Sequence, residues 1–152
     1  MIENTLREAA DMIGTVLGVE PMDETTWLVI FGEEDVVVAT HSEDQEKIFF
    51  RRSIGTPRPE DADRLADLML AFNYLSESVG GMRIGVAGAG GEAALLADLS
   101  THNLTPPHLV SVIETLNQRG AAWQQLLTDP VIADAEAAAE DGPRDLSGMV
   151  QV

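Results

Sequence analysis

Residues 65–75 read L-A-D-L-M-L-A-F-N-Y-L, and the rest of the chain is organised around this segment. Apolar residues recur in it at three- and four-residue steps, which predicts an amphipathic helix. The residues of this stripe are Leu65, Leu68, Met69, Phe72 and Leu75. Leu70, Ala71 and Tyr74 lie off the stripe and are also apolar or aromatic, so the apolar surface is wider than the roughly 100° that a surface helix needs. We therefore expect a second contact, and in a small domain the simplest one is another copy of the chain.

A glycine-rich hairpin is predicted to follow this helix. Residues 82–99 read M-R-I-G-V-A-G-A-G-G-E-A-A-L-L-A-D-L, and glycines at 88, 90 and 91 are typical of the turn between two strands. Helix propensity alone favours a helix over Glu92–Leu99. The glycine turn in front of it favours a strand, and a strand is our prediction.

A second apolar helix is predicted after the hairpin. It begins at Pro106-Pro107, because proline is tolerated in the first turn of a helix. The sequence from residue 105 to 127 reads T-P-P-H-L-V-S-V-I-E-T-L-N-Q-R-G-A-A-W-Q-Q-L-L. Its core stripe consists of Leu109, Val112, Ile113, Leu116, Trp123 and Leu127.

The N-terminal part of the chain predicts one more helix, with an apolar stripe that continues to Leu17. Its start is open between Ile2 and the capping-box pattern at Thr5-Leu6-Arg7-Glu8. Gly18 is expected to end it, and Pro21 prevents its continuation.

Three strand-like runs follow, at Thr25–Phe31, Val36–His41 and Lys47–Ile54. The connections between them are short, which favours an antiparallel meander. In the first run Trp27, Val29 and Phe31 alternate with Leu28 and Ile30, so both faces of the sheet are apolar there. An antiparallel sheet with one face in water normally alternates apolar and polar residues. We therefore expect helices on one face and a partner, a second subunit or the C-terminal segment on the other.

Composition limits the possible functions. The chain has 152 residues, 9 basic and 26 acidic side chains, a net charge of −17 and no cysteine. A length of this kind predicts one domain, which we place at residues 1–129, followed by an acidic, Ala-rich and flexible tail at 130–152. The strong negative charge argues against nucleic-acid binding. The absence of cysteine fits a reducing cytoplasm, and neither a secretory signal nor a membrane-spanning segment is expected.

No catalytic, metal or cofactor motif is recognisable in the sequence. His41, His102 and His108 have no metal-ligand spacing. The glycines at 88–91 lack the lysine of a phosphate-binding loop, and a hairpin turn is the better interpretation. Arg51-Arg52 is interpreted as one residue facing outward and one paired with an acid. We expect no enzyme activity, no metal and no cofactor.

The order of these segments resembles that of the class I type III secretion chaperones, the small acidic effector chaperones of the Tir chaperone family. The resemblance covers residues 2–128. It includes I-G-V-x-x-x-G at residues 84–90, L-x-x-L at 96–99, the proline start and A-A-W-x-x-L-L at 121–127. It implies an α+β fold in the order α-β-β-β-α-β-β-α, with a twisted antiparallel sheet of about five strands and three helices. The glycine-rich turn and the long tail depart from the family pattern.

The resemblance also implies a function and a set of contact residues. The chain would be a homodimer that binds the N-terminal region of a secreted effector and keeps it extended and competent for secretion without ATP. The residues expected to contact the effector are Leu6, Ile13, Trp27, Val29, Phe31, Val36 and Val38. Those expected at the dimer interface are Leu68, Phe72, Leu75 and Ile84.

Two other functions remain open at this point. A non-secretory regulatory or adaptor domain of the same fold would bind another cytoplasmic protein. A small hydrolase or metal enzyme would need a cleft with converging titratable groups. The apolar end of the tail, Met149-Val150, is a candidate for filling an empty effector groove.

Overall fold

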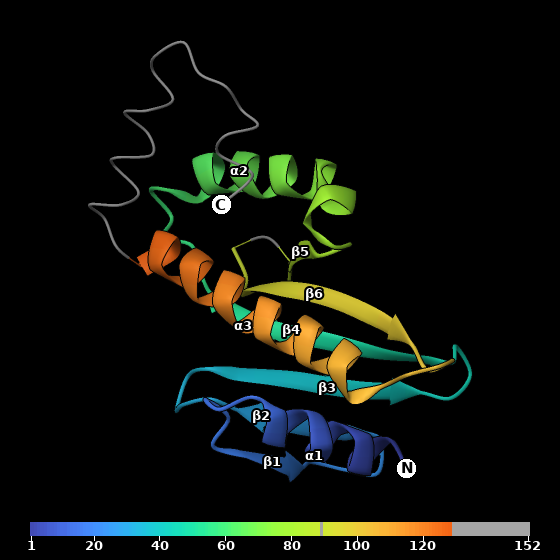
Figure 1. Ribbon diagram of the computed structural model, residues 1–152. Helices are drawn as coiled ribbons and strands as arrows, with labels where there is room; N and C mark the ends of the chain where they lie inside the picture. The colour runs from blue at the N-terminus through green and yellow to red at the C-terminus, as the bar shows by residue number, and fades with distance from the viewer. Residues whose placement is uncertain (89, 129–152) are drawn as a thin grey trace. The chain divides into compact units, whose positions relative to one another are not determined.

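The computed structural model describes residues 1–88 and 90–128, and both the tail at 130–152 and the end of the expected domain at 129 lie outside the described residues. The protein is an α+β structure (Figure 1). Its elements are α1 (Ile2–Met12), β1 (Gly18–Pro21), β2 (Thr26–Ile30), β3 (Val36–Ser42), β4 (Lys47–Gly55), α2 (Ala62–Tyr74), the 3-10 helix η1 (Ser76–Val79), β5 (Arg83–Val86), β6 (Ala93–Ser100) and α3 (Pro106–Thr128).

The six strands form one antiparallel sheet in the order β1-β2-β3-β4-β6-β5. The described residues divide into two compact units, one made of residues 1–52 and 96–118, the other of residues 53–88, 90–95 and 119–128. Strands β4 and β6 and helix α3 run from one unit into the other. We call these the N-terminal and the central unit and describe each by itself.

The expected fold class is confirmed, including the strand at the end of the hairpin, which is β6. The strand count was one too low, because β1 is a sixth strand that pairs with β2 from Gly18 opposite Ile30 to Pro21 opposite Trp27. The first helix begins at Ile2, and the prediction that it reaches Leu17 was wrong, since it ends at Met12. Glycine and β-branched residues are poor helix formers, and the chain becomes extended at Ile13 with φ −97° and ψ 109°.

The hairpin between β5 and β6 depends on its glycines. Gly88 and Gly90 have φ values of +81° and +69°, a region that only glycine enters at little cost. A Cβ atom on Gly91 would collide with the carbonyl oxygen of Ala87. The turn is closed by hydrogen bonds from the Ala87 N–H to the Glu92 carbonyl and from the Gly91 N–H to the Gly88 carbonyl. These glycines therefore serve the turn.

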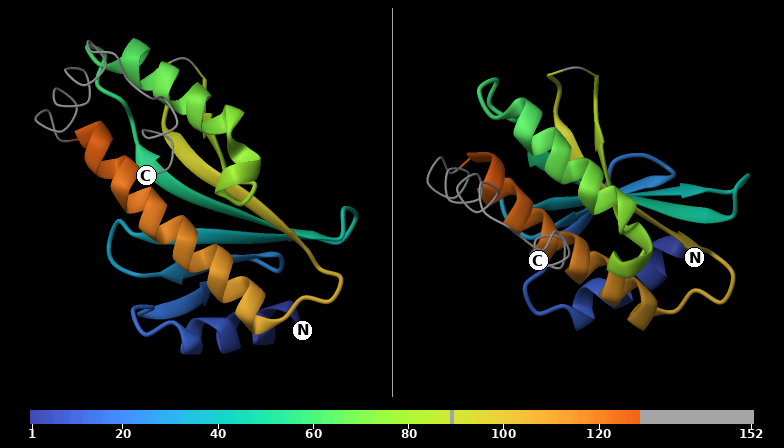
Figure 2. Two further views of the ribbon diagram at one scale, coloured as in Figure 1. Left: turned by 45° about the horizontal axis from the view of Figure 1, so that its top comes forward. Right: turned by 90° about the horizontal axis from the view of Figure 1, so that it is seen from above.

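In the N-terminal unit the strands are buried on one face only. Helix α1 and the first half of α3 lie on the same side of the strands (Figure 2). Trp27 and Val29 of β2 are 5% and 0% exposed, and Val37 and Ala39 of β3 are fully buried. The alternate residues of both strands are only half-buried. The helices thus cover the Trp27 face, and the opposite face has no such cover within this unit.

One charged side chain lies inside this core. Arg52 is fully buried, and its guanidinium donates a 2.6 Å hydrogen bond to the half-exposed carboxylate of Asp35. Burial lowers the pKa of Arg52, and the nearby Asp35 charge opposes that shift. Arg51 is exposed, so the interpretation of one outward and one acid-paired arginine is confirmed.

We expect Asp35→Ala to destabilise the protein, because it removes a partner of a buried positive charge. The free energy of unfolding in urea should fall by about 1–3 kcal/mol. Glu34→Ala in the same turn is the matched control and should change it by no more than about 0.5 kcal/mol. Equal effects of the two substitutions would show that the Arg52–Asp35 pair contributes nothing to stability.

Candidate protein-binding surfaces

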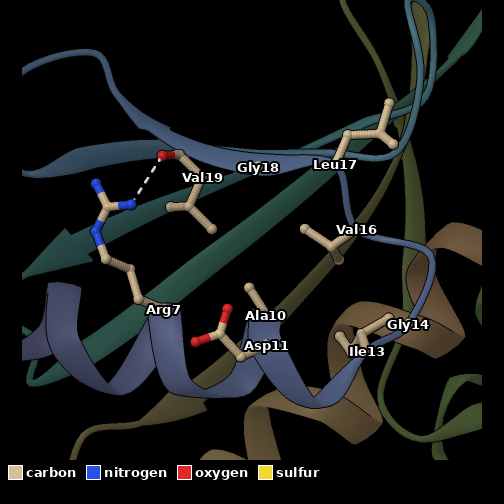
Figure 3. A pocket seen from close by; sticks show the side chains of 9 residues that line it. All are labelled: Arg7, Ala10, Asp11, Ile13, Gly14, Val16, Leu17, Gly18 and Val19. Atoms are coloured by element: carbon tan, nitrogen blue, oxygen red, sulfur yellow. Dashed lines mark hydrogen bonds between the residues drawn. The ribbon is translucent and has the colours of Figure 1, made fainter.

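A groove of about 500 Å³ lies between α1 and the segment that leads into β1. It exists because α1 stops at Met12 and residues 14–17 turn the chain back along the helix. Figure 3 shows Arg7, Ala10 and Asp11 on the helix wall, with Val16 and Val19 pointing in from the opposite side. The other lining residues are Ile13, Gly14, Leu17 and Gly18. Polar and apolar atoms both line the groove: Ile13, Val16, Leu17 and Val19 supply large apolar side chains, and Arg7 and Asp11 are the charged residues of its lining.

Arg7 connects the two walls of the groove, α1 and β1, by a hydrogen bond. Its Nη1 donates a 3.1 Å hydrogen bond to the carbonyl oxygen of Val19, and its Nη2 lies 2.9 Å from the carboxylate of Glu3. The Val19 carbonyl belongs to the outermost strand of the sheet. Pro21, two residues further along that strand, has no N–H to donate. On the free edge of β1, the Val19 carbonyl is thus occupied and Pro21 offers no donor.

The second surface is the face of the sheet opposite α1, which we call the outer face. It is made of half-buried apolar residues on three neighbouring strands. Leu28 lies opposite Val38, and Ile30 lies opposite Val36. Phe49 of β4 lies opposite Thr40. The apolar members of the outer face are Leu28, Ile30, Val36, Val38 and Phe49.

The structure divides the residues predicted to contact an effector between the core and the accessible surface. Leu6, Ile13, Trp27 and Val29 are at most 5% exposed. Of these, Ile13 also lines the groove. Phe31, Val36 and Val38 are half-buried, and the last two lie on the outer face.

Sequence reasoning missed several accessible apolar residues. Met12, Leu17 and Met22 are 58%, 74% and 63% exposed, and Val16 points into the groove. The apolar stripe of the first helix included Val16 and Leu17, but it gave no sign that the helix would end before them. Exposure of large apolar side chains is the signal that identifies such a surface.

The turn between β1 and β2 is fixed by Asp23. Its Oδ1 accepts a 2.8 Å hydrogen bond from the Thr25 N–H and another from the Thr25 hydroxyl. The hydrogen bond from the Thr25 backbone is the main cause that lowers the pKa of Asp23. The turn therefore keeps a negative charge at the end of β1 at neutral pH.

In the central unit, α2 buries its predicted stripe. Leu68, Phe72 and Ile84, predicted at a dimer interface, are 9%, 3% and 6% exposed, and Leu75 is half-buried. The Phe72 ring packs edge-on against Trp123 with ring centres 5.7 Å apart. Leu70 and Tyr74 are 67% and 89% exposed, and their i, i+4 spacing makes them neighbours on the helix surface. The residues off the stripe thus form the apolar face that α2 leaves open.

Strand β5, the other outermost strand, has its backbone partly capped by a side chain. The Asn73 amide donates to the Ile84 carbonyl oxygen at 2.9 Å and accepts from the Ile84 N–H at 2.7 Å. The Val86 carbonyl oxygen accepts from the Gly88 N–H. Asn73 thus takes the place of a neighbouring strand at Ile84.

The start of α2 is held by a buried carboxylate. Asp61 is 8% exposed and accepts hydrogen bonds from Arg58 and, at 3.0 Å, from Arg64. These bonds, that of Arg58 above all, lower the pKa of Asp61 below the ordinary value of an aspartate. A lowered pKa means that Asp61 stabilises the fold above about pH 4 and loses this effect as the pH falls through its folded-state pKa.

We therefore expect Asp61→Asn to destabilise the protein at pH 7 and to do so less and less as the pH falls below about 4. Urea unfolding of wild type and variant across this pH range would measure the difference. Asp63→Asn, which changes an exposed carboxylate two residues further on, is the control. If the difference in unfolding free energy between wild type and Asp61→Asn did not change with pH, the charge of Asp61 would not be the cause of the stabilisation.

Residues 1–88 and 90–128 contain neither a membrane-spanning helix nor a metal-binding cluster. None of their helices is both long and apolar enough to span a membrane. They contain no group of three His, Asp or Glu side chains that could hold a metal ion.

Solved structures share this fold at low sequence identity. The ExsC–ExsE complex matches with a TM-score of 0.68 and 19% identity, over 85% of this chain and 95% of that one. The Yersinia pestis type III secretion chaperone SycH, in complex with a fragment of YscM2, matches with a TM-score of 0.59 and 18% identity, over 81% and 99%. An uncharacterized protein from Methanothermobacter thermautotrophicus also has a TM-score of 0.59, with 12% identity, over 89% and 99%.

Sequence comparison identifies the family. No curated protein matches the chain in sequence. The model of the Tir chaperone protein (CesT) family matches residues 7–124, which is most of the chain. This match and the type III secretion chaperone among the structural neighbours support a chaperone role. The chain belongs to the Tir chaperone protein (CesT) family.

Proposed function

We propose that this protein binds the N-terminal segment of a type III secreted effector in the bacterial cytoplasm and keeps it extended until secretion, without ATP. The observation that carries the proposal is the accessible apolar residues of the N-terminal unit, which lie in the α1–β1 groove and, on the opposite side of the sheet, on the outer face. Family membership implies a binding protein rather than an enzyme. The ExsC–ExsE and SycH–YscM2 structures are themselves complexes with a second protein.

The effector segment contacts accessible side chains in this proposal. In the groove these are Val16 and Val19, above Ile13. On the outer face they are Val36 and Val38 from the predicted set, together with Leu28 and Ile30. The buried members of the predicted set, Leu6, Trp27 and Val29, support these surfaces from behind.

The contacts are made mainly by side chains. Addition of a strand to a sheet edge needs free backbone N–H and C=O groups. Arg7 holds the Val19 carbonyl at one edge, and Asn73 holds both backbone groups of Ile84 at the other. An effector strand could pair there only after these side chains moved away.

The protein forms a homodimer through the open face of α2 in this proposal. Leu70 and Tyr74 are large, adjacent and exposed in the single chain, and burial of such side chains drives association. Leu68, Phe72 and Ile84 hold α2 in its own unit, and Leu75 lies at the margin of the face.

A regulatory or adaptor protein of the same fold is the second candidate. The fold does not separate the two candidates, because an uncharacterized protein from Methanothermobacter thermautotrophicus shares it. The two functions differ in the partner, which is a secreted effector for the chaperone and a resident cytoplasmic protein for the adaptor.

We expect Val16→Thr to weaken binding of the N-terminal region of a secreted protein encoded beside this gene. The substitution keeps the shape of the side chain but replaces a methyl group by a hydroxyl, which costs about 1 kcal/mol of apolar contact, or about fivefold in Kd. Isothermal titration calorimetry would measure the Kd, with circular dichroism as a check of folding.

Met12→Gln is the matched control for this experiment. Met12 is exposed on α1 but does not line the groove, so its substitution should leave the Kd unchanged. If Met12→Gln and Val16→Thr had equal effects, the groove would not be the binding site. If no secreted protein bound the wild type, the chaperone function would be wrong.

We expect Leu70→Asp combined with Tyr74→Asp to convert a dimer into a monomer, because two charges would have to be buried in the interface. Light scattering should give about twice 16.3 kDa for the wild type and 16.3 kDa for the variant. Met12→Asp combined with Met22→Asp changes two residues that are exposed in the N-terminal unit, and it should leave the dimer intact. A monomeric wild-type protein would contradict the proposed dimer. Effector binding would still be tested separately, by the calorimetry of Val16→Thr.

A further inference from the structure

The positive charges of the protein are largely used inside the chain. Arg7 pairs with Glu3, Lys47 with Asp98, and Arg52 with Asp35. Arg58 and Arg64 share Asp61. The chain has 26 acidic side chains and only 9 basic ones, so few cations remain to neutralise the other carboxylates. The field that a partner meets is therefore strongly negative.

This imbalance is pronounced around the α1–β1 groove. Residues 1–26 contain six acidic side chains and one basic side chain, Arg7. The charge of Arg7 is offset by Glu3. Asp11 lies on the wall of the groove (Figure 3) and forms no ion pair with another described residue. Glu8 is exposed three residues before it, on the same side of the helix. The groove thus offers apolar side chains such as Val16 and Val19 next to carboxylates that no described cation pairs with.

We propose that the segment bound in this groove is cationic as well as apolar. Its aliphatic side chains contact Val16 and Val19, and a lysine or arginine beside them lies next to Asp11 and Glu8. This inference rests on the proposed function and specifies the chemistry of the partner. Opposite charges at the margin of an apolar contact speed association and select among partners.

The same argument disfavours two other occupants of the groove. The tail at 129–152 contains six acidic residues and one arginine, so its own charge opposes entry of Met149-Val150. A second copy of α1 would bring Glu3, Glu8 and Asp11 towards the same carboxylates. A segment with lysine or arginine residues would instead reduce the repulsion among the carboxylates beside the groove.

Two fluorescent peptides test the proposal directly. Both carry the same alternating Val and Leu residues, and the residues between these are Lys in one peptide and Glu in the other. Fluorescence anisotropy of the full-length protein should show binding of the Lys peptide at least about tenfold tighter than of the Glu peptide, with an affinity that falls as salt is added. Equal affinities for the two peptides would overturn the proposal.

Substitutions distinguish attraction by the groove from attraction by the overall negative charge of the protein. Glu8→Gln combined with Asp11→Asn should lower the affinity for the Lys peptide by about three- to tenfold and make that affinity less dependent on salt concentration. Glu33→Gln combined with Glu34→Gln removes the same charge from an exposed turn and should change the affinity by less than about twofold. Equal losses in the two double variants would mean that the attraction is non-specific, which overturns the assignment to the groove.

Comparison of the variants already described, together with one truncation, separates the charge proposal from the proposed function. An effector segment whose binding is weakened by Val16→Thr but unchanged by Glu8→Gln with Asp11→Asn would contradict only the charge proposal. Removal of residues 130–152 should leave the Lys-peptide affinity within about twofold. A large gain in affinity on removal would identify the tail as the occupant and overturn the proposal.

Discussion

Strands β2 and β3 are apolar on both faces, and the rest of the structure follows from that constraint. A sheet with two apolar faces needs cover on both, because exposed apolar surface is costly in water. Helices α1 and α3 cover the face with Trp27 and Val29. Leu28, Ile30, Val36 and Val38 remain half-buried on the other face. A protein whose work is to bind an unfolded chain can use such an incompletely covered sheet directly.

Much of the fold was predictable because most elements have a strong local pattern. The alternation in residues 25–54, the glycines at 88–91 and the prolines at 106 and 107 each specify one kind of element. Strand β1 could not be found in this way, since Gly18–Pro21 has a single large apolar residue, Val19, and ends in proline. The end of α1 was also hidden, because Ile13 has the spacing of a helical stripe and is buried although it is extended.

The candidate site was less predictable than the fold, for a physical reason. Alternation in β2 shows that Trp27 and Leu28 face opposite ways, but it does not show which face the helices choose. Within β2, Trp27 and Val29 were predicted to contact the partner, and both are buried under the helices. The same holds in α2, where Phe72 packs against Trp123 and the residues off the stripe, Leu70 and Tyr74, stay accessible. Sequence shows how many apolar faces there are, and only tertiary packing decides which of them is open.

The Asn73 amide at Ile84 and the Arg7 guanidinium at Val19 have a consequence for the behaviour of the protein in the cell. An exposed strand can act as a template on which identical or unfolded chains stack into fibrils. The client that we propose is extended and apolar, so it could add to such a strand. In the proposed function, side chains placed on the backbone at both edges of the sheet would let the protein bind an extended client without acting as a template for its polymerisation.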